Sequence, residues 1–512
     1  MLAAIRSAAV LGIDAYDVTV EVDTARGLPN WTIVGLPTGA VKESRERVSA
    51  ALINAGFTVP PRRITINLSP ADVRKAGSSF DLPIALGMLV ATGQLSVDAV
   101  RDLVAVGELG LDGTIRPVRG ALPIARHVAH ATGALLVLPR ANVAEGALVS
   151  AARLAAPATL GELVVGLNAG ALPHPVVDAR CDAVAVRPAD DFADVVGQES
   201  AKRALEIAAA GGHNVVLIGP PGAGKTMLAR RVPSILPTLT EEEALEVTAI
   251  HSVAGLLPPG QPLVGVRPFR APHHSISGAG LIGGGSAPRP GEVSLAHHGV
   301  LFLDELLEFS RHVVESLRQP MEDGRVVIAR ASTSIAFPAR FTLVGAMNPC
   351  PCGNAGEPSR VCSCAASDIA RYRARLSGPM ADRVDLHVHV GAVPLRELSS
   401  PARAESSATI RARVEDARAR QRARYARLAG VTCNAHASGR WLDAHGGLDR
   451  AARELLTAAA ERVDLTARGY HRVVRVARTI ADLDGVERVL APHIAEALRF
   501  RPATVDDVRL HA

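Results

Sequence analysis

The chain has 512 residues, 48% of them hydrophobic and 21% charged, with a formal net charge of +5 and a pI near 9.0. That length exceeds one hydrophobic core, so we expect two to four domains, and the moderate positive charge permits nucleic-acid binding without requiring it. Six cysteines are too few for a disulfide scaffold, no apolar run could cross a bilayer, and no secretion signal opens the chain, which favours a cytoplasmic protein without a membrane partner.

Residues 1–170 alternate strand-like and helix-like patterns and are predicted to form the first domain. Strand patterns lie at 18–22, 31–34 and 64–68, and helical patterns at 44–55 and 82–92. This mixture is typical of an α/β or α+β domain. Prolines at 173, 175 and 188 then interrupt the periodicity, so we interpret 171–189 as a linker.

A phosphate-binding motif, G-x-x-x-x-G-K-T, lies between a predicted strand at 214–218 and a predicted helix that starts at Met227. Glycines let backbone N–H groups close around phosphate oxygens, and the helix presents the positive end of its dipole. Lys225 is placed to reach the β- and γ-phosphates, and Thr226 to bind Mg²⁺. The predicted nucleotide-binding residues are Gly219, Pro220, Pro221, Gly222, Ala223, Gly224, Lys225, Thr226 and Met227.

Two later apolar runs end in residues that suit nucleotide hydrolysis. The run 300–303 leads into Asp304 and Glu305, of which the first suits Mg²⁺ binding and the second can polarise a water molecule. A strand followed by an acidic helix start would look similar. The run 341–347 leads into Asn348, which could orient that water or simply end the strand.

Residues 395–512 have helical patterns, at 404–428, 451–463, 466–483 and 494–500. The third of these helices opens at Thr466–Arg468 and is basic. Arg383, before this region, stands between acids and by itself indicates only a surface ion pair.

Four cysteines follow Asn348 as two C-x-C pairs, Cys350 with Cys352 and Cys362 with Cys364. Two thiolate pairs joined by a short loop can surround a tetrahedral, structural Zn²⁺. Reduced structural thiols and a redox pair are the alternatives.

Two basic segments could contact DNA phosphates. The candidate residues are Arg267, Arg270, His273 and His274 in a Gly/Pro-rich stretch, and Arg330 and Arg340 around a predicted hairpin of strands 326–329 and 334–337. Exposed charges on ordinary loops are the alternative for each.

Several of these segments carry a family resemblance. Residues 268–275, 288–292 and 303–306 are similar to the magnesium-chelatase-like group of AAA+ ATPases, and the whole chain resembles the YifB/ComM family of competence-associated ATPases. Segments 35–37, 42–44 and 66–72 fit that family too.

The resemblance implies an α/β architecture with a central AAA+ P-loop domain at 190–394 and a C-terminal helical lid at 395–512. It implies that Asn348 is sensor 1, that Arg383 is an arginine finger for the neighbouring subunit and that Arg468 is the sensor-2 arginine. These would act on ATP and Mg²⁺ with Lys225, Asp304 and Glu305.

Relatives of the ComM type imply a ring-shaped homo-oligomer, expected to be a hexamer. Such a ring would act on single-stranded or branched DNA as a branch-migration helicase during natural transformation. The alternative is a magnesium-chelatase-like or chaperone-like ATPase that remodels a protein partner.

The N-terminal segments 75–85 and 106–120 resemble the Lon-protease-like, ribosomal-S5-like α+β domain. Ser79 stands where that family has its nucleophile, but no lysine follows Gly120, and Arg126 cannot act as a neutral base. We therefore expect a docking or substrate-guiding domain without the Ser–Lys dyad.

Overall fold

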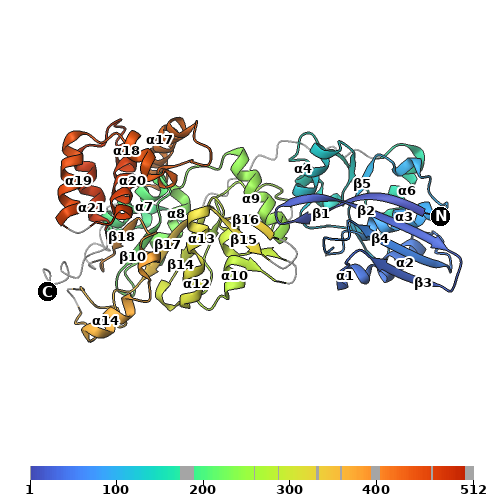
Figure 1. Cartoon of the computed structure of the whole chain (residues 1–512), viewed down its shortest axis with the longest axis horizontal. Coiled ribbons are helices and arrows are strands. Elements are labelled where there is room, and N and C mark those ends of the chain that lie inside the picture. Colours follow the sequence, from blue (N-terminus) through green and yellow to red (C-terminus); the bar gives the residue numbers. More distant parts are fainter. Residues whose placement is uncertain are drawn as a thin grey trace.

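The computed structural model describes residues 2–75, 77–172, 190–258, 260–285, 288–329, 334–357, 360–393, 404–462 and 465–501. Most of the predicted linker, the predicted boundary at 394/395 and Arg330 lie outside these ranges. The chain forms an elongated molecule, with the N-terminal part at one end and the remainder at the other (Figure 1). Within the described residues, no helix is long and apolar enough to cross a membrane.

The N-terminal part is built on a seven-stranded mixed sheet of order β3-β4-β2-β1-β5-β8-β9. Its strands are β1 (Leu2–Leu11), β2 (Asp14–Ala25), β3 (Asn30–Val34), β4 (Arg63–Ser69), β5 (Leu103–Ala105), β8 (Leu135–Val137) and β9 (Arg153–Ala155). Valines 18, 20 and 22 of β2 point to one face because side chains alternate along a strand, and all three are buried. The predicted mixture of strands and helices is therefore confirmed.

Helices cover both faces of this sheet. Helices α2 (Ser44–Asn54), α3 (Asp81–Ala91) and α6 (Leu160–Ala169) share one apolar core with β1, β2 and β4. Helix α4 (Ala121–Ala131) packs on the opposite face. The smaller elements are α1 (Gly39–Lys42), α5 (Val143–Gly146), and the paired strands β6 (Glu108–Leu109) and β7 (Ile115–Arg116).

The second sheet has five parallel strands in the order β11-β14-β17-β10-β18. They are β10 (Val215–Ile218), β11 (Phe269–Arg270), β14 (Val300–Leu303), β17 (Thr342–Met347) and β18 (Leu386–His389). Successive residues of β10 and β14 enter two different cores, one on each face of the sheet. Because all strands are parallel, their carboxyl ends lie at one edge, where α/β proteins bind ligands.

One face of this sheet is covered by α7 (Glu199–Gly211), α8 (Lys225–Ile235) and the C-terminal helices, all within one apolar core. The C-terminal helices are α17 (Ser407–Tyr425), α18 (Gly439–His445), α19 (Arg450–Arg462), α20 (Ala467–Leu483) and α21 (Ala491–Arg499). The four predicted C-terminal helices are confirmed within a few residues. The short α18 was not predicted.

The opposite face carries α10 (Gly278–Ile282), α11 (Glu292–Leu295), α12 (Arg311–Ser316) and α13 (Arg318–Asp323). The predicted hairpin is confirmed as β15 (Arg325–Ala329) paired antiparallel with β16 (Ser334–Pro338). The short strands β12 (Gly283–Gly284) and β13 (Arg289–Pro290) pair nearby, and α14 (Ala366–Arg373) and α15 (Gly378–Ala381) precede β18.

The two parts meet at helix α9 (Glu241–Ala254) and at the hairpin (Figure 1). The Ser252 hydroxyl on α9 donates a hydrogen bond to the buried Glu145 carboxylate. Glu145 also accepts the backbone N–H of Leu122, at the start of α4, at 2.8 Å. On the hairpin, Ile335 lies beside the Gly12 turn of the N-terminal sheet. Helix α9 thus links the N-terminal sheet to the five-stranded sheet.

Candidate nucleotide-binding site

The phosphate loop joins β10 to α8 and needs its glycines. Gly222 and Gly224 have φ of +82° and +88°, a region that residues with a Cβ rarely adopt. A Cβ on Gly219 would lie 2.0 Å from the backbone oxygen of Val390, which follows β18. The loop therefore turns tightly at the carboxyl edge of the sheet. Its backbone N–H groups and those of the first turn of α8 lie together at that edge.

Lys225, the first residue of α8, folds back over the loop. Its Nζ donates to the backbone oxygens of Gly219 at 2.6 Å and Pro220 at 2.9 Å, and to Asn348 Oδ1 at 3.1 Å. Burial lowers the pKa of Lys225, and the carboxylates of Asp304 and Glu305 oppose that shift. The contact with Asn348 places the predicted sensor residue beside the phosphate-binding lysine.

The two residues predicted to bind Mg²⁺ lie next to Lys225, Thr226 in the sequence and Asp304 in the fold. The Thr226 hydroxyl donates to Asp304 Oδ2 at 2.7 Å, so the two residues predicted to bind magnesium are in direct contact. Hydroxyl and carboxylate oxygens are the ligands that Mg²⁺ prefers. Together with the glycine loop and Lys225, these residues fit a nucleoside triphosphate with its magnesium ion.

Glu305 follows directly and adopts a left-handed backbone conformation, with φ of +52°. Its N–H donates to Asp304 Oδ1 at 3.0 Å, and its side chain is 60% exposed. The turn separates the two acids, because Asp304 faces Thr226 while Glu305 faces solvent. This orientation suits one carboxylate for the metal and the other for a water molecule.

His274 lies beside Glu305, although the sequence suggested it only as a DNA contact. Its Nδ1 is 3.5 Å from Glu305 Oε2, and its ring meets Phe309 edge-on. Since β11 and β14 are neighbours in the sheet, the residues that follow them meet at the same edge. The sequence shows that His274 follows β11 closely. Only the fold shows that β11 lies beside β14, the strand that precedes Glu305.

Arg383 lies at the opposite, amino edge of the sheet. The Asn214 side chain, just before β10, donates to the Arg383 backbone oxygen at 3.0 Å. The Arg383 guanidinium donates to the backbone oxygen of Pro379 at 2.6 Å and is paired with Glu322 of α13, and its buried Nε has no hydrogen-bond partner among the described residues. The phosphate loop and Arg383 of one chain are thus separated by the length of the strands.

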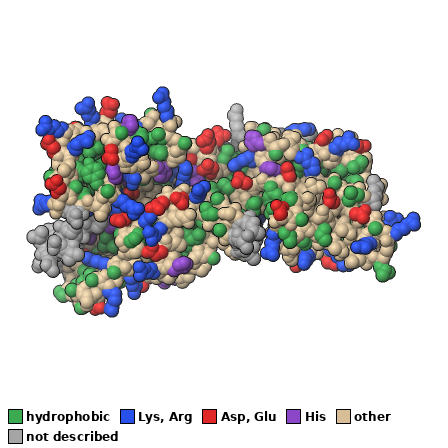
Figure 2. Space-filling model, in the orientation of Figure 1, with side chains coloured by type: hydrophobic (Ala, Val, Ile, Leu, Met, Phe, Trp, Pro, Cys, Tyr) green, Lys and Arg blue, Asp and Glu red, His purple; other side chains and the backbone are tan. Residues whose placement is uncertain are grey.

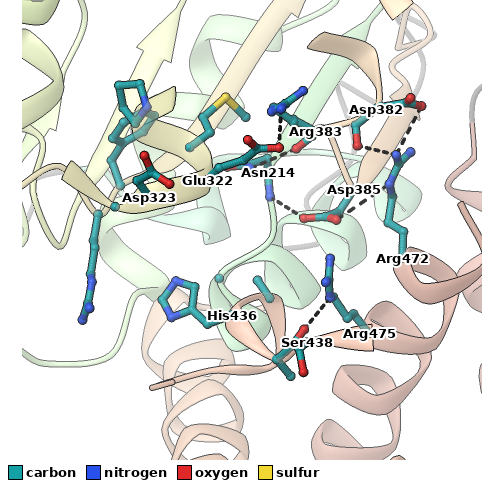
Figure 3. Close-up of a pocket in the computed structure, with 18 of the residues that line it drawn as sticks. Asn214, Glu322, Asp323, Asp382, Arg383, Asp385, His436, Ser438, Arg472 and Arg475 are labelled. Atoms are coloured by element: carbon teal, nitrogen blue, oxygen red, sulfur yellow. Dashed lines mark hydrogen bonds and ion pairs between the residues drawn. The ribbon is translucent and has the colours of Figure 1, made fainter. Parts of the chain in front are cut away.

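Arg383 lines a cavity of ≈ 460 Å³ between the sheet edge and the C-terminal helices (Figure 3). From α20, Arg468, Arg472 and Arg475 line the same cavity, and Arg468 is exposed. Arg472 donates to the backbone oxygen of Asp382 and lies 4.0 Å from Asp385. The structure therefore brings the predicted finger and sensor-2 arginines together, at the edge opposite their own phosphate loop.

The proposed DNA-contact residues differ in their surroundings. Arg267 donates to the backbone oxygens of Pro237 and His298, at 2.6 and 2.7 Å, and pairs with Glu243. Arg270 makes a two-pronged pair with Glu292 at 2.6 and 2.8 Å.

His273 is exposed, and Arg340 is half-buried in the cavity that Arg383 lines. On the face shown in Figure 2, acidic and basic side chains are interspersed. Both Arg267 and Arg270 have internal partners, so neither is free for a phosphate.

The four cysteines converge as predicted. Their sulfur atoms all lie within 4.8 Å of one another, and three of the separations are 3.4, 3.6 and 3.7 Å. Four sulfurs at a Zn–S distance of about 2.3 Å from one ion stand about 3.8 Å apart. The Asn354 and Ser363 backbone N–H groups and neighbouring thiols lower the pKa of Cys352 to about 6. The cluster has the donors and spacing that Zn²⁺ requires.

A second polar cluster was not anticipated from the sequence. Glu246 on α9 accepts from His297 Nε2 at 3.1 Å and from His298 Nε2 at 2.8 Å, just before β14. The Arg340 backbone N–H donates to His297 Nδ1 at 3.0 Å, so the proton of a neutral His297 is on Nε2. That tautomer cannot ligate a metal through Nε2, so the cluster is a hydrogen-bonded clamp between α9 and the sheet.

In the N-terminal domain, Ser78 rather than Ser79 hydrogen-bonds an acid, Glu108. Arg126 lies within α4. Lys75 is fully buried, and its Nζ has no hydrogen-bond partner among the described residues. No hydrogen bond between a lysine amine and Ser79 occurs in the part of the chain that the structure describes.

The fold and site define a P-loop nucleotide-binding protein, and comparisons with known proteins narrow this class. Three family models match in chain order: the "Subunit ChlI of Mg-chelatase" model over residues 20–142, "Magnesium chelatase, subunit ChlI" over 191–398, and the ChlI C-terminal model over 404–501.

The chain is 42% identical to the competence protein ComM of Haemophilus influenzae over 510 residues, which cover 98% of this chain and 97% of that protein. It is also 42% identical over its full length to YifB of Escherichia coli, of which 98% is covered. A magnesium-chelatase 38 kDa subunit of Cereibacter sphaeroides is 30% identical over 175 residues, which are 31% of this chain and 52% of that subunit.

These matches and the site geometry together identify a magnesium-chelatase-like, AAA+-type ATPase, whose cofactors are ATP and Mg²⁺. More narrowly, the chain belongs to the YifB/ComM family.

Proposed function

We propose that this protein is a ring-forming ATPase motor that acts on single-stranded or branched DNA, as a branch-migration helicase. The proposal of a ring is supported by one observation: the phosphate loop and Arg383 lie at opposite edges of the same sheet. Strands of four to six residues, at about 3.3 Å per residue, separate these edges by roughly 13–20 Å. Arg383 therefore cannot reach the phosphates on its own loop, whereas a neighbouring subunit could bring its loop to the cavity.

In this arrangement, Lys225 binds the β- and γ-phosphates, and Thr226 and Asp304 hold Mg²⁺, which neutralises charge on the phosphates. Glu305 polarises the attacking water, and Asn348 orients it. Arg383 and Arg468 serve the neighbour's nucleotide, so Arg383 must leave Glu322 when the ring assembles. An arginine finger supplied in trans raises phosphoryl-transfer rates by about 10³–10⁵. We propose a hexamer because AAA+ rings commonly close with six subunits.

Complementation between two inactive variants tests the shared site. Arg383→Ala keeps its own phosphate loop, and Lys225→Ala keeps its finger, so a mixture contains some interfaces with both parts intact. We expect measurable ATP hydrolysis in the mixture and almost none in either variant alone. If both variants assemble but their mixture remains inactive, Arg383 is a structural ion-pair residue and the shared-site mechanism fails.

DNA as the substrate is supported by the word "competence" in the name of the full-length relative and by the net positive charge. The proposed contacts are His273, His274 and Arg340 within the described residues and Arg330 outside them, whereas Arg267 and Arg270 would have to leave their internal partners. We expect single-stranded or forked DNA to stimulate ATP hydrolysis several-fold, and less at high salt because phosphate contacts release counterions. Hydrolysis that DNA does not change, but that a protein partner stimulates, would favour the chaperone-like alternative.

The four cysteines are proposed to hold one structural Zn²⁺ per chain. Metal analysis of protein purified without chelator should give a zinc-to-chain ratio near one. The ratio should fall in a Cys350→Ser/Cys364→Ser double variant. A ratio near zero in the wild-type protein would leave the cluster as four reduced thiols.

The N-terminal part, residues 1–170, is proposed as a docking or substrate-guiding domain without protease activity, and residues 395–512 as the lid. The proposal that the N-terminal part has no protease activity is supported by one observation. Among the described residues, no lysine is hydrogen-bonded to Ser79. Peptidase activity that Ser79→Ala abolishes would refute it.

A further inference from the structure

The loop that carries the four cysteines, described at residues 349–357 and 360–365, meets the phosphate loop at Gly353. Gly353, between the two cysteine pairs, has φ of +82°, and a Cβ there would lie 2.5 Å from Cδ of Pro221. Pro221 is the third residue of the phosphate-binding motif. The approach is so close that only glycine fits at this position without displacing one of the two loops.

The start of this loop lies at the catalytic side of the sheet, and the helix that follows the loop is bonded to that start. The loop starts directly after Asn348, whose Oδ1 accepts from Lys225 Nζ at 3.1 Å. Pro349 accepts a hydrogen bond at its backbone oxygen from Arg373 Nε on α14, the helix that follows the loop, at 3.1 Å. The loop therefore leaves the nucleotide site at Asn348 and returns beside it at α14.

Cys350 holds the residues that follow it, up to Ala355, close to the sulfur cluster. The Cys350 backbone oxygen accepts the N–H of Gly353 at 3.0 Å, and its buried Sγ accepts the N–H of Ala355 at 3.3 Å. These bonds fix Gly353 relative to the sulfur cluster. A change at the cluster must therefore move Gly353 or break these bonds.

From these contacts we infer that the four-cysteine loop is a wall of the nucleotide site. Its metal-bound form holds the phosphate loop closed through Gly353 and Pro221, and fixes Asn348 next to Lys225. This inference rests on the proposed zinc site and assigns it a role in ATP binding in addition to local stability. Loss of the metal loosens the loop, so the phosphate-binding residues are less well ordered before ATP binds.

A matched pair of glycine variants isolates the contact. Gly356 lies in the same loop with φ of +80°, but a Cβ there would meet no atom of the described residues within 4 Å. Gly353→Ala and Gly356→Ala therefore impose the same backbone strain, and only the first pushes against Pro221. We expect Gly353→Ala to raise the Kd for a fluorescent ATP analogue at least ~5-fold above that of Gly356→Ala. A zinc content near one per chain in both variants would show that the loop still folds.

Removal of the metal is the second test of this inference. Wild-type protein stripped with a zinc-selective chelator, with Mg²⁺ then restored, should bind the ATP analogue several-fold more weakly and recover when Zn²⁺ is returned. An unchanged Kd after zinc loss, or equal Kd values for the two glycine variants, would overturn the inference. If the wild-type protein is purified without metal, both the proposed zinc site and its role in ATP binding are wrong. The proposed ATPase function does not depend on that result, because Glu305→Gln tests it separately.

Discussion

Asp304 and Glu305 are adjacent in sequence, but the left-handed backbone at Glu305 gives them different surroundings. Such a conformation costs a non-glycine residue about 1–2 kcal/mol, and it persists here at the carboxyl edge of β14. Its effect is to leave Asp304 on Thr226 while Glu305 projects toward solvent and His274. At the scale of single residues, one backbone angle thus separates two neighbouring acids, as the proposed division between metal binding and water activation requires.

Replacing Glu305 tests this assignment. Glu305→Gln should still bind ATP and Mg²⁺, because Lys225, Thr226 and Asp304 are intact. Its turnover should be at least ~100-fold slower, because the amide cannot accept a proton from the attacking water. Nucleotide binding and steady-state hydrolysis measure the two properties separately. Near-normal turnover would remove Glu305 from the catalytic role.

His274 is expected to act as a positioning residue for Glu305. His274→Ala should lower kcat by ~2–5-fold and leave KM for ATP unchanged, since the lost contact with Glu305 is of the order of 1 kcal/mol. With hydrolysis measured in the absence of DNA, His273→Ala is the matched control, because His273 is exposed and bonds Ser275 rather than Glu305. Equal kcat values for the two variants would show that the His274–Glu305 contact has no part in hydrolysis.

At the scale of elements, α9 is held at two points. In its middle, Glu246 accepts from His297 and His298, which precede β14, and near its C-terminus Ser252 donates to Glu145 of the N-terminal part. Helix α9 therefore spans from the N-terminal sheet to the amino end of the strand that carries Asp304. Hydrogen bonds from the two histidines hold the pKa of Glu246 well below its usual value.

The clamp should make stability sensitive to acid. Burial lowers the pKa of His297 from 6.5 to about 4, with Glu246 opposing the shift and His298 and Arg340 adding to it. The unfolded chain takes up a proton at this residue below about pH 6.5 and the native protein only near 4, so stability is lost as the pH falls through that window.

The loss should be up to roughly 3 kcal/mol, from 1.36 kcal/mol per pKa unit. Urea unfolding at pH 7.5 and pH 5.0 measures the part of this loss that falls above pH 5.0, roughly 2 kcal/mol. His297→Asn, which keeps a donor and an acceptor, should show a smaller decrease between the two pH values. An identical decrease would place the acid sensitivity at other groups.

At the scale of the whole molecule, the residues proposed for catalysis lie at two opposite edges of one sheet. The phosphate loop lies at the carboxyl edge of the five-stranded sheet, and Arg383, Arg468 and Arg472 line the cavity at the amino edge. The proposed shared site therefore combines two chains in a head-to-tail arrangement, which closes into a ring when the rotation between subunits permits.

Specific ATPase activity should consequently fall when the wild-type protein is diluted, because rings dissociate by mass action. The residual activity of Arg383→Ala should change little over the same concentrations, since its sites are incomplete even when assembled. Activity per chain that is constant down to concentrations at which sedimentation shows only monomers would contradict a shared site.

Local patterns in the sequence determined the features that depend on neighbouring residues. The phosphate loop, the strands that end at Asp304 and Asn348, the hairpin and the longer C-terminal helices all have their signals within about ten residues. The cysteine spacing likewise predicted that four sulfurs could meet. These predictions succeeded because periodicity, glycine conformations and motif spacing are properties of short segments.

Only the tertiary structure decided which of these segments meet. The parallel order of strands brings His274 to Glu305 and places Arg383 opposite the phosphate loop, and neither relation follows from separation along the chain. The internal partners of Arg267 and Arg270 come from other elements, as do the Glu246–His297–His298 clamp and the contact of Gly353 with Pro221. Such contacts depend on strand order and on packing between distant segments, and one sequence does not specify these locally.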